Sequence, residues 1–150
     1  MSPSTLPAGA STTRANVGFL LAKAGQRWNE LLRQSFVAAG YPEVSPSYGS
    51  LLIPLWEEDG LRMGELARRA RLSKQTITTM VRLLERDGLV SREPDAADGR
   101  ATVIRLTARA HEFKTVAEKT LAQLYDALTE RLSAEGARRL EEALKQVGEM

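Results

Sequence analysis

Residues 61–107 read LRMGELARRARLSKQTITTMVRLLERDGLVSREPDAADGRATVIRLT, and this stretch decides the fold. It begins with a short helical segment, which is followed by a turn and by a second helical segment with one apolar and one polar face. Two runs of β-branched and apolar residues come next, on either side of a loop that contains Asp98-Gly99-Arg100. This order is typical of a helix-turn-helix followed by a β-hairpin wing, a shape suited to reading duplex DNA.

The two helices of this motif have clear ends in the sequence. The first is predicted over 63–70, with Leu66 and Ala67 facing inward. The second is predicted over 74–87, with Ser73 as its N-cap and Gly88 as the left-handed residue that stops it. A turn of only a few residues therefore separates two amphipathic helices, as in a helix-turn-helix.

The second helix has a face suited to DNA. Ile77, Met80, Val81 and Leu84 recur at helical spacing and are predicted to face the core. The opposite side is polar, and its N-terminal part is where a recognition helix contacts bases, whereas arginines further along are better placed for phosphates. An ordinary amphipathic surface helix is the alternative. The predicted DNA contacts on this helix are Ser73, Lys74, Gln75, Thr76, Thr78, Thr79, Arg82 and Arg86.

The wing favours the DNA-binding interpretation. Strands are predicted over 89–92 and 102–106, and the loop over 93–100 between them is acidic overall. Asp98 is placed to pair with Arg100 or with Arg92 and to aim a guanidinium into a narrow minor groove. The alternative is that Asp98-Gly99 makes only a turn, and the two roles are compatible. Asp98 and Arg100 complete the predicted DNA contacts.

The flanking sequence predicts a mainly α fold around this small hairpin. Residues 1–13 form a Pro/Ser/Thr-rich tail, predicted to be mobile, and residues 14–150 form one domain. Helices are predicted over 14–39, over 46–56 with a kink or early end at Pro54, from Thr107 to Leu132, and from Ser133 onward. The outer helices, in 14–40 and 107–150, have long apolar stripes that predict dimerisation, and residues 45–106 form the DNA-binding lobe.

Composition limits the function classes. Residues 60–109 contain 11 Lys and Arg against 6 Asp and Glu, and the rest of the chain contains 10 against 13. A basic segment on a mildly acidic body suits phosphate binding, although a solvated charged surface would look the same. The chain has no Cys and one His, and we find no phosphate loop or nucleophile–base pair, so neither an enzyme nor a metal or cofactor site is predicted. No apolar run could span a bilayer, and we expect a cytoplasmic protein with no membrane partner.

With these residues in view, the chain resembles the MarR family, the multiple-antibiotic-resistance-type regulators. The matching blocks are Gly64-Glu65-Leu66-Ala67, the run from Leu83 to Val90, and Asp98-x-Arg100 followed by Leu106-Thr107. The resemblance covers residues 14–150. It implies a homodimer that binds double-stranded DNA at a palindromic operator, often represses, and is often released by a small ligand.

The resemblance also implies a pocket where the dimer helices meet the DNA-binding lobe. Trp28, Tyr48 and Trp56 fall on helices that would wall it, and His111 is early on the fifth helix, so a small aromatic effector is the candidate ligand. Core packing is the alternative for the aromatic residues, and a solvated or capping role for His111. The alternative function is an architectural DNA binder or a protein-interaction module with no effector. A more Lys-rich face is expected for an architectural binder.

Overall fold

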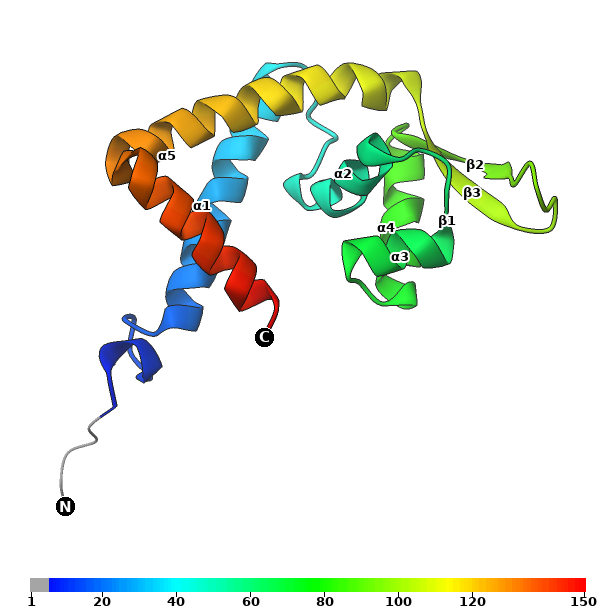
Figure 1. Ribbon diagram of the computed structural model, residues 1–150. Coiled ribbons are helices and arrows are strands. Elements are labelled where there is room, and N and C mark those ends of the chain that lie inside the picture. Colours follow the sequence, from blue (N-terminus) through cyan, green and yellow to red (C-terminus); the bar gives the residue numbers. More distant parts are fainter. Residues whose placement is uncertain (1–5) are drawn as a thin grey trace. The chain divides into compact units, whose positions relative to one another are not determined.

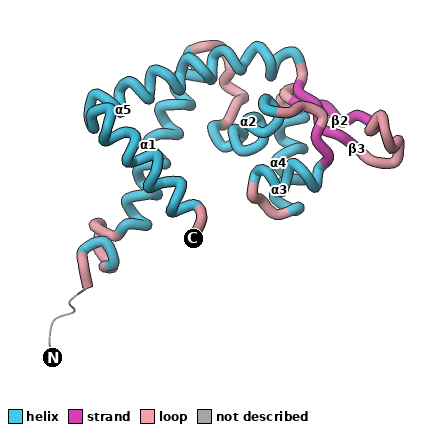
Figure 2. Tube along the Cα trace, in the orientation of Figure 1, coloured by secondary structure: helices cyan, strands magenta, loops and turns pink. Residues whose placement is uncertain are grey.

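The computed structural model describes residues 6–150, which divide into two compact units with the boundary between Ser50 and Leu51. Figures 1 and 2 trace the helices and strands along the chain. Residues 1–5 of the predicted mobile tail lie outside the described residues, and the rest of that tail contains a short 3-10 helix, η1 (Ala8–Ala10). The prediction of one domain over 14–150 stays a prediction.

The first unit is built on α1 (Val17–Ala38). The predicted start at Arg14 was too early, because the side chain of Asn16 caps the helix by accepting a hydrogen bond from the backbone N–H of Phe19 at 3.2 Å. The 3-10 helix η2 (Pro46–Tyr48) packs against α1 within this unit.

The helix predicted over 46–56 is in fact two elements. After η2 the chain continues as α2 (Gly49–Glu57), which passes through Pro54 instead of ending there. Proline removes one backbone donor, but Leu51, Leu52 and Leu55 are buried and hold the helix by packing.

The second unit contains the predicted helix-turn-helix. α3 (Met63–Ala70) and α4 (Lys74–Arg86) have the predicted starts, and the predicted inward residues of α3 are buried. Arg71 takes the left-handed conformation at the turn, with φ 55° and ψ 43°, and its Nη1 donates to the carbonyl of Gly148 at 2.9 Å. Gly88 follows α4 with φ 74°, which confirms its role as the residue that ends the recognition helix.

The sheet has three strands where two were predicted. β2 (Val90–Pro94) and β3 (Thr102–Leu106) form the wing, and β1 (Leu61–Arg62) pairs with β3 on its other side. All pairing is antiparallel, with Val90 opposite Leu106 and Leu61 opposite Ile104. The predicted loop included Pro94, which instead belongs to β2, because β2 is an edge strand and tolerates a residue without a backbone donor.

α5 (Ala108–Gly148) is capped by Thr107, as predicted. The hydroxyl of Thr107 also donates to the carbonyl of Gly88 at 2.7 Å, and its backbone N–H donates to the carbonyl of Leu89 at 3.1 Å. Ser133 interrupts α5 with φ 68° and ψ 166°. Figure 1 shows that α5 changes direction in its orange part. The prediction that a last helix begins at Ser133 is confirmed.

The core of the second unit joins both halves of the helix-turn-helix to the sheet and to the start of α5. Its side chains are apolar and almost fully buried. The predicted fold class, mainly α with a β wing, is confirmed. Within residues 6–150, no helix is long and apolar enough to cross a membrane. The largest fully buried side chains of this unit are Leu51, Leu52, Leu55, Leu66, Ile77, Val81, Leu84, Leu89, Ile104 and Phe113.

Candidate nucleic-acid interface

The recognition helix α4 has the two faces that its sequence predicts, with two differences. Ile77, Val81 and Leu84 have no exposed surface, but Met80 is only half-buried, so it lies at the edge of the apolar face. Thr78, predicted on the polar side, is also half-buried. The other residues of the polar side are exposed, namely Lys74, Gln75, Thr76, Thr79, Arg82 and Arg86.

Two threonine hydroxyls of this helix bond to its own backbone. Oγ1 of Thr78 donates to the carbonyl of Lys74 at 2.8 Å, and Oγ1 of Thr79 donates to the carbonyl of Gln75 at 3.1 Å. Each hydroxyl hydrogen is therefore occupied, while the oxygen lone pairs and the methyl group stay available to another molecule.

Ser73 and Thr76 have structural roles at the N-terminus of α4. Oγ of Ser73 accepts from the backbone N–H of Thr76 at 3.1 Å and donates to Oγ1 of Thr76 at 2.9 Å. This cap satisfies one of the free backbone donors of the first turn and fixes where the helix begins. The same two residues were predicted as DNA contacts, which stays a prediction beside the observed capping role.

Arg86, near the C-terminal end of α4, is held by an acidic neighbour. Its Nε and Nη2 lie 3.1 Å and 3.2 Å from the two carboxylate oxygens of Asp87. The Asp87 side chain is only 11% exposed, so the guanidinium is anchored to the protein surface. Arg82 lies one turn earlier on the exposed side.

The wing loop brings Asp98 and Arg100 together, as one of the two predicted pairings requires. Oδ1 of Asp98 accepts from the backbone N–H of Arg100 at 3.1 Å, and Nε of Arg100 lies 3.7 Å from the same oxygen. The other proposed partner, Arg92, pairs instead with Glu85 at 3.4 Å. The Arg100 side chain is 97% exposed at the end of the hairpin, so Asp98 both makes a turn and contacts the arginine.

Sequence reasoning missed other ion pairs and hydrogen bonds that involve the wing. Nε of Arg62 donates to Oδ2 of Asp95 at 2.7 Å, which ties the start of α3 to the wing loop. Nε of Arg105 lies 2.7 Å from Glu93, which joins β3 to β2. Asp59 supports the base of the sheet, because its Oδ1 accepts from the backbone N–H of Leu106 at 2.9 Å. The acidic loop was the available signal, since its carboxylates needed basic partners elsewhere in the lobe.

A second ion-pair cluster stiffens α3. Glu65 accepts from Nε of Arg68 at 3.0 Å and from Nε of Arg69 at 2.9 Å, and Arg69 also pairs with Glu58. The hydrogen bond from Arg68, followed by that from Arg69, lowers the pKa of Glu65 to about 2. The carboxylate is therefore ionised at neutral pH, and two of the basic side chains near the turn are paired.

The four residues predicted to wall a ligand pocket have different environments. In the first unit Tyr48 is buried and Trp28 is half-buried. In the second unit Nε1 of Trp56 donates to the carbonyl of Ala110 at 3.3 Å, and its ring centroid lies 6.1 Å from that of Phe113. His111 is exposed. Trp56 thus has the packing role that was its alternative, and a shared pocket stays a prediction.

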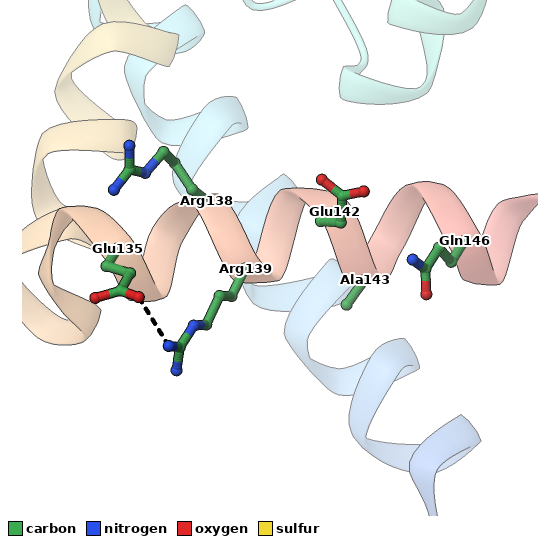
Figure 3. A pocket seen from close by; sticks show the side chains of 6 residues that line it. All are labelled: Glu135, Arg138, Arg139, Glu142, Ala143 and Gln146. Atoms are coloured by element: carbon green, nitrogen blue, oxygen red, sulfur yellow. Dashed lines mark hydrogen bonds and ion pairs between the residues drawn. The ribbon is translucent and has the colours of Figure 1, made fainter.

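Two surface hollows lie elsewhere. One, of about 440 Å³, follows the second half of α5, where Glu135 pairs with Arg139 at 2.7 Å (Figure 3). The other, of about 270 Å³, lies in the first unit between polar residues of α1 and the start of η2. Neither is lined by the four predicted ligand residues. In the part of the chain that the structure describes, no group of three or more His, Asp or Glu side chains could hold a metal ion.

Comparisons with known proteins agree with this geometry. Residues 44–102 match the MarR family. The chain is similar to the HTH-type transcriptional repressor Rv2887 of Mycobacterium tuberculosis, with 31% identity over 136 residues that cover 89% of this chain and 94% of the relative. A regulator of Methylorubrum extorquens, TtmR, is 39% identical over 69 residues, which are 46% of this chain and 35% of that protein.

Solved structures share the fold. A transcriptional repressor, CouR, bound to a 23-mer DNA duplex, superposes with a TM-score of 0.77 at 24% identity, covering 97% of this chain and 99% of CouR. The PcaV regulator of Streptomyces coelicolor, in complex with its natural ligand, gives 0.75 at 23% identity, covering 93% and 97% of the two chains. The near-complete alignment with the mycobacterial repressor, the matched family region and the winged helix-turn-helix lead to one conclusion. The chain belongs to the MarR family, and it is a winged helix-turn-helix transcriptional regulator, not an enzyme.

Proposed function

We propose that this regulator binds a palindromic operator as a homodimer, with α4 in the major groove and the wing in the adjacent minor groove. The observation that supports this most directly is the exposed polar face of α4, which belongs to the same unit as the 97% exposed Arg100 of the wing. Gln75 and Thr79 read bases, and Arg82 and Arg86 bind phosphates, because the N-terminal part of a recognition helix enters the groove most deeply.

The threonine hydrogen bonds indicate which bases α4 would recognise. Because the hydroxyl of Thr79 already donates to the backbone, its oxygen acts as an acceptor. In the major groove the complementary donors are the amino groups of adenine and cytosine, and the thymine methyl suits the threonine methyl. Gln75 adds the bidentate pairing that side-chain amides make with adenine.

Dimerisation is supported by apolar side chains that each unit leaves exposed. In α1, Val17, Phe19 and Leu20 are 52%, 41% and 53% exposed, and in the last part of α5, Leu144 and Val147 are 47% and 43% exposed. Apolar stripes of this kind on terminal helices suit an isologous interface between two copies. A dimer would carry two copies of the DNA-binding lobe predicted over 45–106. Two symmetry-related lobes suit the two half-sites of a palindrome.

The direction of regulation and the effector are also proposals. The mycobacterial relatives are named as repressors, which supports repression by this chain in the cytoplasm, where its DNA target lies. PcaV was solved in complex with its natural ligand, which supports release of this chain by a small effector, and we propose a small aromatic molecule. The alternative, an architectural or protein-interaction module, fits the family less well.

Selection from random DNA tests the operator proposal. The protein is expected to enrich a palindrome, and the selected duplex then serves as the probe. Gln75→Ala and Thr79→Ala are expected to change which bases are preferred, whereas Arg86→Ala weakens binding to cognate and scrambled duplexes about equally. Enrichment of no sequence would favour the architectural alternative, and a change of base preference with Arg86→Ala alone would show that α4 is oriented differently.

The effector proposal has its own test. Trp28 and Trp56 are the only tryptophans, so quenching of their fluorescence reports on binding near either helix. A panel of small aromatic acids is titrated against the wild type and against Trp28→Phe and Trp56→Phe. A binding compound is expected to release the selected duplex, and a compound that quenches without releasing DNA would contradict its role as effector.

A further inference from the structure

Arg62 connects the helix-turn-helix to the far end of the wing. It is the last residue of β1 and the residue before α3, and its Nε and Nη2 lie 2.7 Å and 2.5 Å from Oδ2 of Asp95. Asp95 is the first residue of the loop after β2, and its side chain is 18% exposed. The pair therefore bridges elements that are 33 residues apart in the sequence.

Asp95 also organises the loop that presents Arg100. Its Oδ1 accepts from the backbone N–H of Ala97 at 3.0 Å, and its own N–H donates to the carbonyl of Ala101 at 2.9 Å. The hydrogen bond from Ala97 and then that from Arg62 lower the pKa of Asp95, so the carboxylate stays ionised at neutral pH. Asp98 continues the arrangement by accepting from the N–H of Arg100.

Apart from this ion pair, the strand pairing that attaches the wing to the helix-turn-helix is short. β1 contributes two residues, and its pairing ends at Arg62 opposite Val103. Beyond that point β2 and β3 pair only with each other, and the Glu93–Arg105 ion pair lies within the hairpin. The Glu93–Arg105 pair thus stays within the hairpin, whereas Arg62 and Asp95 join its tip to the start of α3.

We propose that Arg62 is a positioning residue for DNA binding, which acts through Asp95 to hold the wing tip at the orientation where Arg100 and α4 contact one duplex together. The proposal rests on the proposed function of Arg100 in the minor groove. A site held by packed or hydrogen-bonded neighbours binds more tightly than the same groups on a mobile hairpin, because less conformational entropy is lost on binding.

The chain offers a matched control. Asp95→Asn and Glu93→Gln each remove one negative charge from the wing and keep the size of the side chain. Electrostatics alone predicts that both variants bind DNA slightly more tightly, because a carboxylate near phosphates is lost. If Asp95 positions the wing, Asp95→Asn instead weakens binding to the selected duplex about tenfold, within the range of one lost specific contact, and Glu93→Gln does not.

A double-mutant cycle with Arg100→Ala completes the test. Asp95→Asn and Arg62→Ala are each expected to weaken binding when Arg100 is present. They are expected to have little further effect in the Arg100→Ala background, because they act through the position of Arg100. Thermal unfolding followed by circular dichroism shows that each variant is folded. Titrations at two salt concentrations report the number of phosphate contacts.

A result that contradicts the proposed function of the wing can be told apart from one that contradicts the role of Arg62 and Asp95. If Arg100→Ala binds as well as wild type, the proposed function of the wing is wrong. If Arg100→Ala weakens binding but Asp95→Asn does not, the wing contacts DNA without this positioning and the inference is overturned. If Arg62→Ala weakens binding and lowers the salt dependence while Asp95→Asn tightens binding, Arg62 is itself a phosphate contact, and the inference is again overturned.

Discussion

Arg100 is the wing residue that we propose contacts DNA; its side chain is 97% exposed, and its backbone N–H donates to Asp98. Arg100→Ala is expected to lose roughly 1–3 kcal/mol of operator binding without unfolding the protein. The loss should be larger on operators with A·T-rich flanks, because narrow minor grooves concentrate negative potential. Fluorescence anisotropy with duplexes that differ only in their flanks measures both effects.

Asp98→Ala provides the companion experiment. An orienting role predicts weaker binding, although the change removes a negative charge, whereas simple electrostatics predicts tighter binding at low salt. Tighter binding at low salt would mean that Asp98 makes only a turn.

Glu65 makes a pH-dependent contribution to stability. Its pKa is about 2 in the folded protein against an ordinary value of 4.5, because Arg68 and Arg69 hydrogen-bond to the carboxylate. A lowered folded-state pKa means that the stabilisation is present above pH 4.5 and is lost as the pH falls from 4.5 towards 2. Glu65→Gln should therefore make the midpoint temperature of thermal unfolding depend less on pH across this range, and an unchanged pH dependence would contradict the assignment.

At the scale of helices and strands, the sequence predicted elements whose ends are set by local chemistry. Ser73, Gly88 and Thr107 marked the ends of α4 and the start of α5, because side-chain caps and a left-handed glycine act within a few residues. The wing strands followed from β-branched residues on either side of a polar loop. Most of the fold could be predicted in this way.

Features that depend on distant contacts could not be predicted. β1 is two residues long and exists only because β3 pairs with it. α2 continues past Pro54 because its leucines are buried, a tertiary effect that overrides the local preference of proline. Within the candidate site, the exposed residues of α4 followed from helical spacing, but the pairing of Arg62 with Asp95 brings together segments far apart in sequence.

The break in α5 gives a prediction about an element. Ser133 has φ 68° and ψ 166°, a region that favours glycine, and its Oγ accepts from the backbone N–H of Gly136 at 3.2 Å. Ser133→Ala should lose the cap and keep the unfavourable backbone, which lowers the free energy of unfolding by about 1 kcal/mol. Ser133→Asp retains an acceptor and should lose less. Urea unfolding at fixed protein concentration compares the two, and an unchanged free energy of unfolding in Ser133→Ala would mean that the cap contributes nothing.

At the scale of the whole molecule, the expected particle is a dimer of about twice 16.5 kDa. Leu144 is 47% exposed in the single chain, so Leu144→Asp should leave each protomer folded and weaken association, because a carboxylate would be buried unpaired at the interface. Leu128→Asp tests the half-buried part of the same stripe. Thr115→Asp, at an exposed polar position of α5, is the control. Sedimentation equilibrium at micromolar concentration measures the mass of each variant, and a monomeric wild type would contradict the predicted dimer.

Thr107, the N-cap of α5, donates hydrogen bonds to the carbonyls of Gly88 and Leu89, the residues that follow α4. The start of α5 is therefore hydrogen-bonded to the segment that ends α4. Local opening of the recognition helix from its C-terminal end must therefore also release the start of α5. Native-state hydrogen exchange should find the amides of Leu89 and Thr107 protected to the same degree and exposed in one opening event. The exposed face of α4 would then be as resistant to local unfolding as the long helix that follows it.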